Sequence, residues 1–123
     1  MGSILIVDDE QRFRDVYKIL LGKEGYTIFD VSNAVNARDI LKNEKIDVVL
    51  LDINMPELQG DILYDIIQSF HKNMRVIVTS VLPIDEQITK IPGAYDYFDK
   101  SDGLDLLLAK VKRAIPPEPS HAV

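Results

Sequence analysis

The chain contains no cysteine among its 123 residues, so it can form neither a disulfide framework nor a thiolate metal site. Its formal net charge is −6, and no stripe of Lys and Arg stands out. Because proteins grip a nucleic-acid backbone with clustered basic side chains, direct nucleic-acid binding by this domain is not expected. Every apolar stretch ends well short of the roughly 20 residues that span a bilayer. No signal-peptide pattern precedes Ile4, so the default expectation is a cytoplasmic protein with no membrane association.

The length predicts a single domain. With 46% hydrophobic residues, the chain can bury one adequate core and has no room for a second. The segment 116–123 reads Pro-Pro-Glu-Pro-Ser-His-Ala-Val, which cannot continue a helix and has little to bury. We therefore expect a domain over residues 1–115 and a proline-rich tail or linker over 116–123.

Short, continuous apolar runs predict buried parallel strands. Such runs occur at 4–7, 48–51 and 76–78, and their lack of alternation is typical of strands covered on both faces. Segments 26–31 and 95–98 predict two further strands. Stripes of helical period lie between the runs; their members are Phe13, Val16, Tyr17 and Leu20, then Ala34, Ala37, Ile40 and Leu41, then Ile62, Leu63, Ile66, Ile67 and Phe70, and finally Leu104, Leu107, Leu108 and Val111.

The fourth helix is the shortest of those expected. Pro83 can start it and Pro92 must end it, which leaves a segment from Ile84 to about Lys90. The pattern then predicts an α/β fold: a doubly wound, five-stranded parallel sheet of order 2-1-3-4-5, flanked by five helices.

Polar side chains follow four of the predicted strands. They are Asp8 with Asp9, Asp52, Thr79 and Lys100, and a doubly wound sheet brings such strand ends to one edge, where its ligands bind. Two carboxylates about 4 Å apart repel each other by about 4 kcal/mol at an effective dielectric of about 20. Oxygen ligands and crowded negative charge favour Mg²⁺.

Each of these residues also has a simpler interpretation. Asp8 and Asp9 could cap the helix that follows them, and Asp52, followed by Asn54 and Pro56, could form an ordinary turn. Independent turn chemistry would not, however, require acids at two neighbouring strand ends with a hydroxyl and a lysine at the next two.

The sequence resembles the receiver domain of two-component response regulators from Ile4 to about Ile115. Four motifs in order carry the resemblance: Ile-Leu-Ile-Val-Asp-Asp-Glu at 4–10, Leu-Leu-Asp-Ile-Asn-Met-Pro at 50–56 with Gly60 following, Val-Thr-Ser at 78–80, and Gly-Ala-Tyr-Asp-Tyr-Phe-Asp-Lys at 93–100. The resemblance implies a chemotaxis-regulator-like, flavodoxin-like fold and a signalling switch rather than an enzyme with its own substrate.

The resemblance also implies a role for each residue. Asp52 would accept a phosphoryl group from a sensor histidine kinase or a histidine phosphotransfer protein, and Lys100 and Thr79 would contact that group. Mg²⁺ would be held by Asp8, Asp9, Asp52 and the backbone carbonyl of Asn54. Tyr97 would turn inward after Thr79, reshaping the face built from the fourth helix, the last strand and the last helix. A phosphorylation-dependent homodimer is compatible with this scheme.

Two positions depart from the family pattern. The family usually has proline after the lysine, often with a cis peptide bond, whereas Ser101 follows Lys100 here, and the isomer of this bond stays open. Pro83 and Pro92 also bracket an unusually short fourth helix.

Two other functions compete with this interpretation. A Mg²⁺-dependent phosphohydrolase of haloacid-dehalogenase type also uses a strand-end aspartate, but it typically carries a second aspartate where this chain has Asn54, and it usually needs a cap domain. A phosphorylation-independent pseudo-receiver would not require Asp8, Asp9, Asp52, Thr79 and Lys100 together.

Overall fold

The structure is a computed structural model that describes residues 2–54, 60–70 and 73–115. Three features of the sequence analysis lie outside these residues: Met55, Pro56 and the tail at 116–123. No helix in the described part of the chain is long and apolar enough to cross a membrane.

Strands and helices alternate along the described chain. The strands are β1 (Ser3–Val7), β2 (Thr27–Val31), β3 (Val48–Asp52), β4 (Arg75–Ser80) and β5 (Asp96–Asp99). The helices are α1 (Gln11–Gly22), α2 (Ala34–Asn43), α3 (Gly60–Phe70), α4 (Ile84–Lys90) and α5 (Leu104–Ala114). The strands pair in parallel in the order β2-β1-β3-β4-β5, so the predicted fold class and strand order are confirmed.

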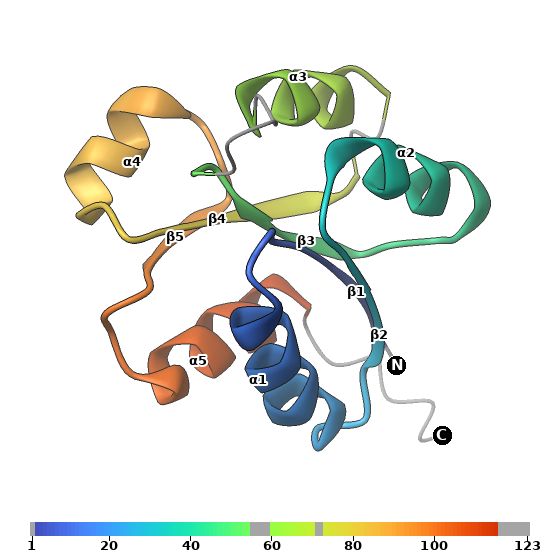
Figure 1. The fold of residues 1–123 in the computed structure, drawn as a ribbon, viewed down its shortest axis with the longest axis horizontal. Coiled ribbons are helices and arrows are strands. Elements are labelled where there is room, and N and C mark those ends of the chain that lie inside the picture. The colour runs from blue at the N-terminus through green and yellow to red at the C-terminus, as the bar shows by residue number, and fades with distance from the viewer. Residues whose placement is uncertain (1, 55–59, 71–72, 116–123) are drawn as a thin grey trace, which may run out of the picture.

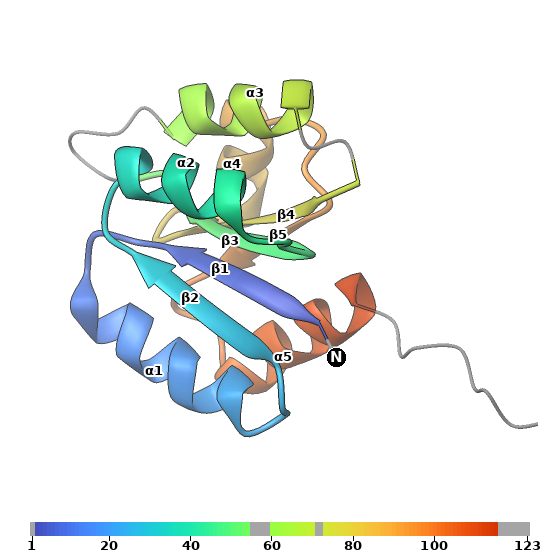
Figure 2. The same cartoon turned by 90° about the vertical axis from the view of Figure 1, so that its right-hand side faces the viewer.

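Helices cover both faces of the sheet, as Figures 1 and 2 show: α2, α3 and α4 lie on one face, and α1 and α5 lie on the other. Each face has its own core because successive side chains of a strand point to opposite sides. In β1, Leu5 and Val7 belong to the core under α2 and α3, whereas Ile4 and Ile6 belong to the core over α1 and α5. Burial of all four residues of this run explains its unbroken apolar character.

The short fourth helix ends where the prolines predict. Helix α4 spans Ile84–Lys90, between Pro83 and Pro92, as expected from the sequence. Gly93 then adopts a φ of 85°, a left-handed conformation that favours glycine, and the chain turns toward β5.

Two of the predicted apolar stripes each include one residue that is exposed. In α1, Val16 is 37% exposed whereas Tyr17 and Leu21 are buried, and in α5 Leu104 is 40% exposed. Val16 lies at the margin of the face that Phe13, Tyr17 and Leu21 share at i, i+4 spacing. Leu104 is the first residue of its helix.

Candidate functional site

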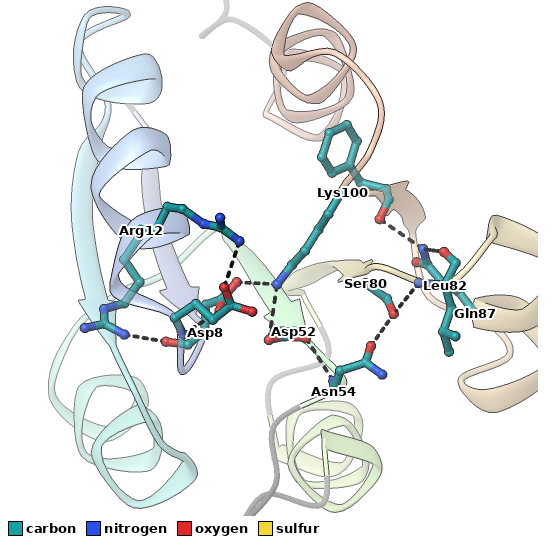
Figure 3. Close-up of polar contacts among 11 residues, drawn as sticks. Asp8, Arg12, Asp52, Asn54, Ser80, Leu82, Gln87 and Lys100 are labelled. Atoms are coloured by element: carbon teal, nitrogen blue, oxygen red, sulfur yellow. Dashed lines mark hydrogen bonds and ion pairs between the residues drawn. The ribbon is translucent and has the colours of Figure 1, made fainter.

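The polar strand ends meet at one edge of the sheet. Strand register places Val7 beside Leu51, Asp52 beside Thr79, and Ser80 beside Asp99, so the residues at these strand ends lie side by side. Because the strands are parallel, their carboxyl ends form a single edge. The structure thus brings Asp8, Asp52 and Lys100 into direct contact (Figure 3).

Lys100 bridges the two buried carboxylates. Its Nζ lies 2.8 Å from Oδ2 of Asp8 and 3.2 Å from Oδ2 of Asp52, and all three side chains are no more than 3% exposed. The ammonium also lies 4.2 Å from the ring centroid of Phe13 in α1, which adds a cation–π contact. A buried ammonium needs several such partners, since losing one partner of a buried ion pair leaves the other charge uncompensated.

Asp8 is anchored by the backbone and by α1. Its Oδ1 accepts a hydrogen bond from the amide of Glu10 at 2.9 Å, and its carbonyl accepts one from Nη1 of Arg14 at 2.7 Å. Arg14 also pairs with Asp30 of β2 at 3.2 Å. The residue that caps α1 is Glu10, without a side-chain hydrogen bond, so helix capping does not account for the position of the Asp8 carboxylate.

Asp52 is held at both oxygens. Its Oδ1 accepts a hydrogen bond from the amide of Asn54 at 2.8 Å, and its Oδ2 faces Lys100. Burial raises the pKa of Asp52 to about 6, and the charge of Asp8 acts in the same direction, while the Asn54 amide and Lys100 oppose the rise. The bond to Asn54 is the turn that the simpler interpretation expects, but a turn does not require burial against a lysine and a second carboxylate.

The acidic cluster fits a magnesium ion. Asp8, Asp9 and Asp52 each offer one carboxylate oxygen, and these oxygens all lie within 4.8 Å of one another. Two oxygens on opposite sides of a bound Mg²⁺ are about 4 Å apart, so small side-chain movements suffice to coordinate it. Asp9 is exposed, unlike the other two. Three carboxylates and one ammonium leave a formal charge of −2, which a divalent cation balances.

A second group of polar side chains flanks Asp52. Ser80, fully buried at the end of β4, donates a hydrogen bond from its Oγ to Oδ1 of Asn54. The same Oγ accepts a hydrogen bond from the amide of Leu82 at 3.0 Å. Ser80 therefore ties the loop after β3 to the loop after β4.

The two predicted switch residues are both buried. Thr79 lies next to Asp52 in the β3–β4 register and is 1% exposed. Tyr97 of β5 points into the core under α3 and α4. Its hydroxyl donates to the carbonyl of Ile91 at 2.5 Å and accepts from the amide of Ala94 at 3.1 Å.

The segment after Lys100 is ordered by Asp99 and has a trans peptide between Lys100 and Ser101. Oδ1 of Asp99 accepts hydrogen bonds from the amide and the hydroxyl of Ser101, at 2.9 and 2.7 Å. The Lys100 amide donates to the carbonyl of Ser80 at 2.8 Å. Lys100 therefore reaches both carboxylates without a proline after it.

Sequence reasoning missed three residues that support the site: Phe13, Arg14 and Gln87. The apolar spacing of Phe13 predicts only a core position, and nothing in the sequence marks Arg14 as part of the site. Gln87 lies in α4 and is fully buried, although nothing in the local sequence distinguishes it from an exposed helical glutamine. Contacts between distant segments create all three roles, which the local sequence does not specify.

Relatives of known function share this sequence pattern. Residues 4–112 match the response regulator receiver domain family. The chain is 35% identical over 116 residues to sporulation initiation phosphotransferase F of Bacillus subtilis (strain 168), covering 93% of this chain and 94% of that protein. It is 32% identical over 116 residues to the DNA-binding transcriptional regulator NtrC of Proteus hauseri, covering 93% of this chain and 24% of that protein.

Solved structures share the fold. The response regulator TrrA of Thermotoga maritima, determined in complex with Mg²⁺-BeF, is similar with a TM-score of 0.84 and 31% identity, covering 94% of this chain and all of that one. A two-component response regulator from Clostridium difficile has a TM-score of 0.86 and 25% identity, covering 94% and 96% of the two chains. The chain belongs to the response regulator receiver domain family of two-component signalling.

Proposed function

We propose that residues 1–115 form a receiver domain that accepts a phosphoryl group on Asp52 from a histidine kinase or a histidine phosphotransfer protein. One observation carries the proposal: Lys100 bridges two buried carboxylates, Asp8 and Asp52, with the exposed Asp9 beside them. This arrangement supplies a nucleophile, a cationic ligand for phosphoryl oxygens and an oxygen site for a metal. Segment 116–123 would be a tail or linker.

Asp52 would act as the nucleophile. One carboxylate oxygen forms a bond to phosphorus while the bond from phosphorus to the imidazole nitrogen of the donor breaks, and the electron pair leaves with the imidazole. A pKa of about 6 keeps Asp52 largely ionised at neutral pH. Phosphoryl transfer depends mainly on positioning and charge neutralisation, and Lys100 already lies 3.2 Å from an oxygen of Asp52.

Asp8, Asp9, Asp52 and the backbone carbonyl of Asn54 would hold Mg²⁺. When bound, the ion would neutralise charge on the phosphoryl oxygens. The chain's part is to keep the carboxylates close together: Glu10 and Arg14 fix Asp8, and the amide of Asn54 fixes Asp52. The similar TrrA was solved in complex with Mg²⁺-BeF, which supports magnesium binding by this chain.

Thr79 and Tyr97 would transmit the change. A phosphoryl group on Asp52 adds charge and acceptor oxygens, and Thr79 lies beside Asp52 in the sheet register. Tyr97, one strand further along, hydrogen-bonds the chain that leaves α4. We infer that the face formed by α4, β5 and α5 responds to phosphorylation.

A histidine kinase is the expected partner. The T. maritima response regulator TrrA, 31% identical to this chain, has been solved in complex with the histidine kinase ThkA. The kinase that recognises this chain would deliver its phosphohistidine to the edge of the sheet where Asp52 lies.

Intact mass measurement after incubation with acetyl phosphate and Mg²⁺ tests the proposal. We expect one phosphoryl adduct on the parent protein, none on Asp52→Asn, and the parental result for Asp39→Asn, which removes an exposed carboxylate in α2. An adduct that survives Asp52→Asn would contradict the assignment. Continuous release of phosphate from small phosphate esters would instead indicate a phosphohydrolase.

A further inference from the structure

Gln87 is a fully buried polar side chain in α4, away from the acidic cluster. Its Nε2 donates two hydrogen bonds, to the carbonyl of Leu82 at 2.8 Å and to the carbonyl of Phe98 at 3.0 Å. Because carbonyl oxygens only accept hydrogen bonds, these two partners fix the orientation of the amide. Gln87 thus joins the loop before α4 to strand β5.

One end of this connection leads to Asp52 through the loop after β4. The amide of Leu82 donates to Oγ of Ser80, which also bonds to Oδ1 of Asn54. The amide of Asn54 in turn donates to Oδ1 of Asp52. A continuous series of hydrogen bonds, joined through the covalent bonds of Leu82 and Asn54, therefore runs from Gln87 to one oxygen of Asp52 (Figure 3).

The other end leads to the second oxygen of the same carboxylate. Phe98, whose carbonyl accepts from Gln87, lies two residues before Lys100 on the same chain. Nζ of Lys100 pairs with Oδ2 of Asp52 at 3.2 Å. These contacts form a closed circuit that begins and ends on Asp52. Asn54, Ser80 and Leu82 form one arm, which leads from Asp52 to Gln87, and Phe98 and Lys100 form the other arm, which leads back to Asp52.

Resting on the proposed function, we propose that Gln87 is a positioning residue that couples the chemical state of Asp52 to the position of α4. A phosphoryl group forms a bond to one oxygen of Asp52, so the contact of that oxygen with Asn54 or with Lys100 must change. Either change moves one arm of the circuit relative to the other, and Gln87 is the side chain that links both arms to α4.

Two features of α4 suit it to respond. It has only seven residues, too few to be stable alone, so its position depends on its contacts with the rest of the fold. In addition, Oε1 of Gln87 is buried without a hydrogen-bond partner among the described residues. An unmet buried acceptor is unfavourable, so the Gln87 amide holds α4 through its two donated hydrogen bonds.

The test compares two variants of the circuit with a matched control. Gln87→Met keeps length and helix propensity but removes both donated hydrogen bonds, and Ser80→Ala removes the hydroxyl between Asn54 and Leu82. Gln68→Met makes the same chemical change at an exposed position of α3. Amide chemical shifts of α4 are recorded by NMR before and after treatment with acetyl phosphate and Mg²⁺, and intact mass gives the phosphorylated fraction of each sample.

We expect the phosphorylation-induced shifts in α4, scaled to the phosphorylated fraction, to fall by about two-fold or more in Gln87→Met and in Ser80→Ala, but not in Gln68→Met. Shifts at Asp9, outside the circuit, should persist in Gln87→Met, which a general loss of structure would not allow. An adduct with parental α4 shifts in both variants would contradict the coupling alone. If Gln87→Met does not fold, parental shifts in Ser80→Ala would still overturn it. Failure of the parent to form an adduct would contradict the proposed function and, with it, the coupling.

Discussion

At the scale of single residues, the site buries more negative charge than the ammonium of Lys100 neutralises. Asp8 and Asp52 share one ammonium, that of Lys100. The pKa of Asp52 rises from 3.8 to about 6 because burial outweighs the help of Lys100 and of the Asn54 amide. The carboxylate proposed as nucleophile is therefore also a source of instability in the metal-free protein.

Removing this charge should stabilise the metal-free protein at neutral pH. Since the folded state binds the proton of Asp52 more tightly than the unfolded state, the contribution of Asp52 to stability is full below its unfolded pKa of 3.8 and is lost as pH rises through about 6. The Asp52→Asn side chain does not ionise, so this variant does not lose that stability as pH rises. With EDTA present, its free energy of unfolding should exceed that of the parent by on the order of 2 kcal/mol near pH 7.5, and by less near pH 4.5.

Urea unfolding followed by circular dichroism measures both free energies. Lys100 keeps its partner Asp8 in this variant, so the substitution leaves no unpaired ammonium. A difference between variant and parent that stays the same at both pH values, or a variant less stable than the parent near pH 7.5, would show that Asp52 is not destabilising when ionised.

The residues at the strand ends were predictable because the sheet order alone places them together. Asp8, Asp52 and Lys100 each follow a strand, and parallel pairing leaves little freedom for where strand ends meet. The additional bonds of Ser80 depend on side-chain conformations and loop paths, which the sequence does not specify. Predicting the cation–π contact of Lys100 with the Phe13 ring likewise requires knowing how α1 packs against the sheet.

At the scale of elements, prolines and glycines set the boundaries. Pro83 and Pro92 predicted α4 to within a residue of its observed range, Ile84–Lys90, because proline cannot occupy a helix interior. The buried face of so short a helix was not predictable from periodicity, since two turns give too few positions to define a stripe. Gln87 is on that face because β5 and the loop before α4 supply carbonyls for it.

The turn from α4 into β5 should depend on Gly93. Its φ is 85°, and a Cβ added there would approach only the Tyr64 hydroxyl, at 3.7 Å, so substitution introduces backbone strain without a clash. We expect Gly93→Ala to lower the free energy of unfolding by about 1 to 2 kcal/mol. Gly22→Ala is the matched control, because Gly22 ends α1 with open space around it and alanine there should add up to about 0.5 kcal/mol.

Chemical unfolding of both glycine variants separates conformation from side-chain volume. Each substitution adds one methyl group where no atom crowds it, so only the backbone differs between the sites. Equal stability of Gly93→Ala and Gly22→Ala would mean that the turn before β5 relaxes at no cost, and that α4 and β5 are less firmly joined than their hydrogen bonds indicate.

At the scale of the whole molecule, the acidic cluster links metal binding to folding. Its carboxylates come from the loop after β1 and from β3, which are far apart in an unfolded chain, so Mg²⁺ should bind the folded state much better than the unfolded one. Above the dissociation constant, each tenfold rise in Mg²⁺ should then add about 1.4 kcal/mol to the free energy of unfolding. Urea titrations at matched ionic strength, which holds general screening constant, measure this slope.

Asp9 distinguishes coordination from a general effect of divalent ions. It is the exposed member of the cluster, so Asp9→Asn removes a ligand without disturbing the buried pairs of Lys100. We expect the stabilisation by Mg²⁺ to begin at a concentration about tenfold higher or more in Asp9→Asn, while Asp39→Asn in α2 follows the parent. If both variants respond like the parent, Mg²⁺ acts on the protein's overall negative charge, and the three oxygens that lie within 4.8 Å of one another do not form its site.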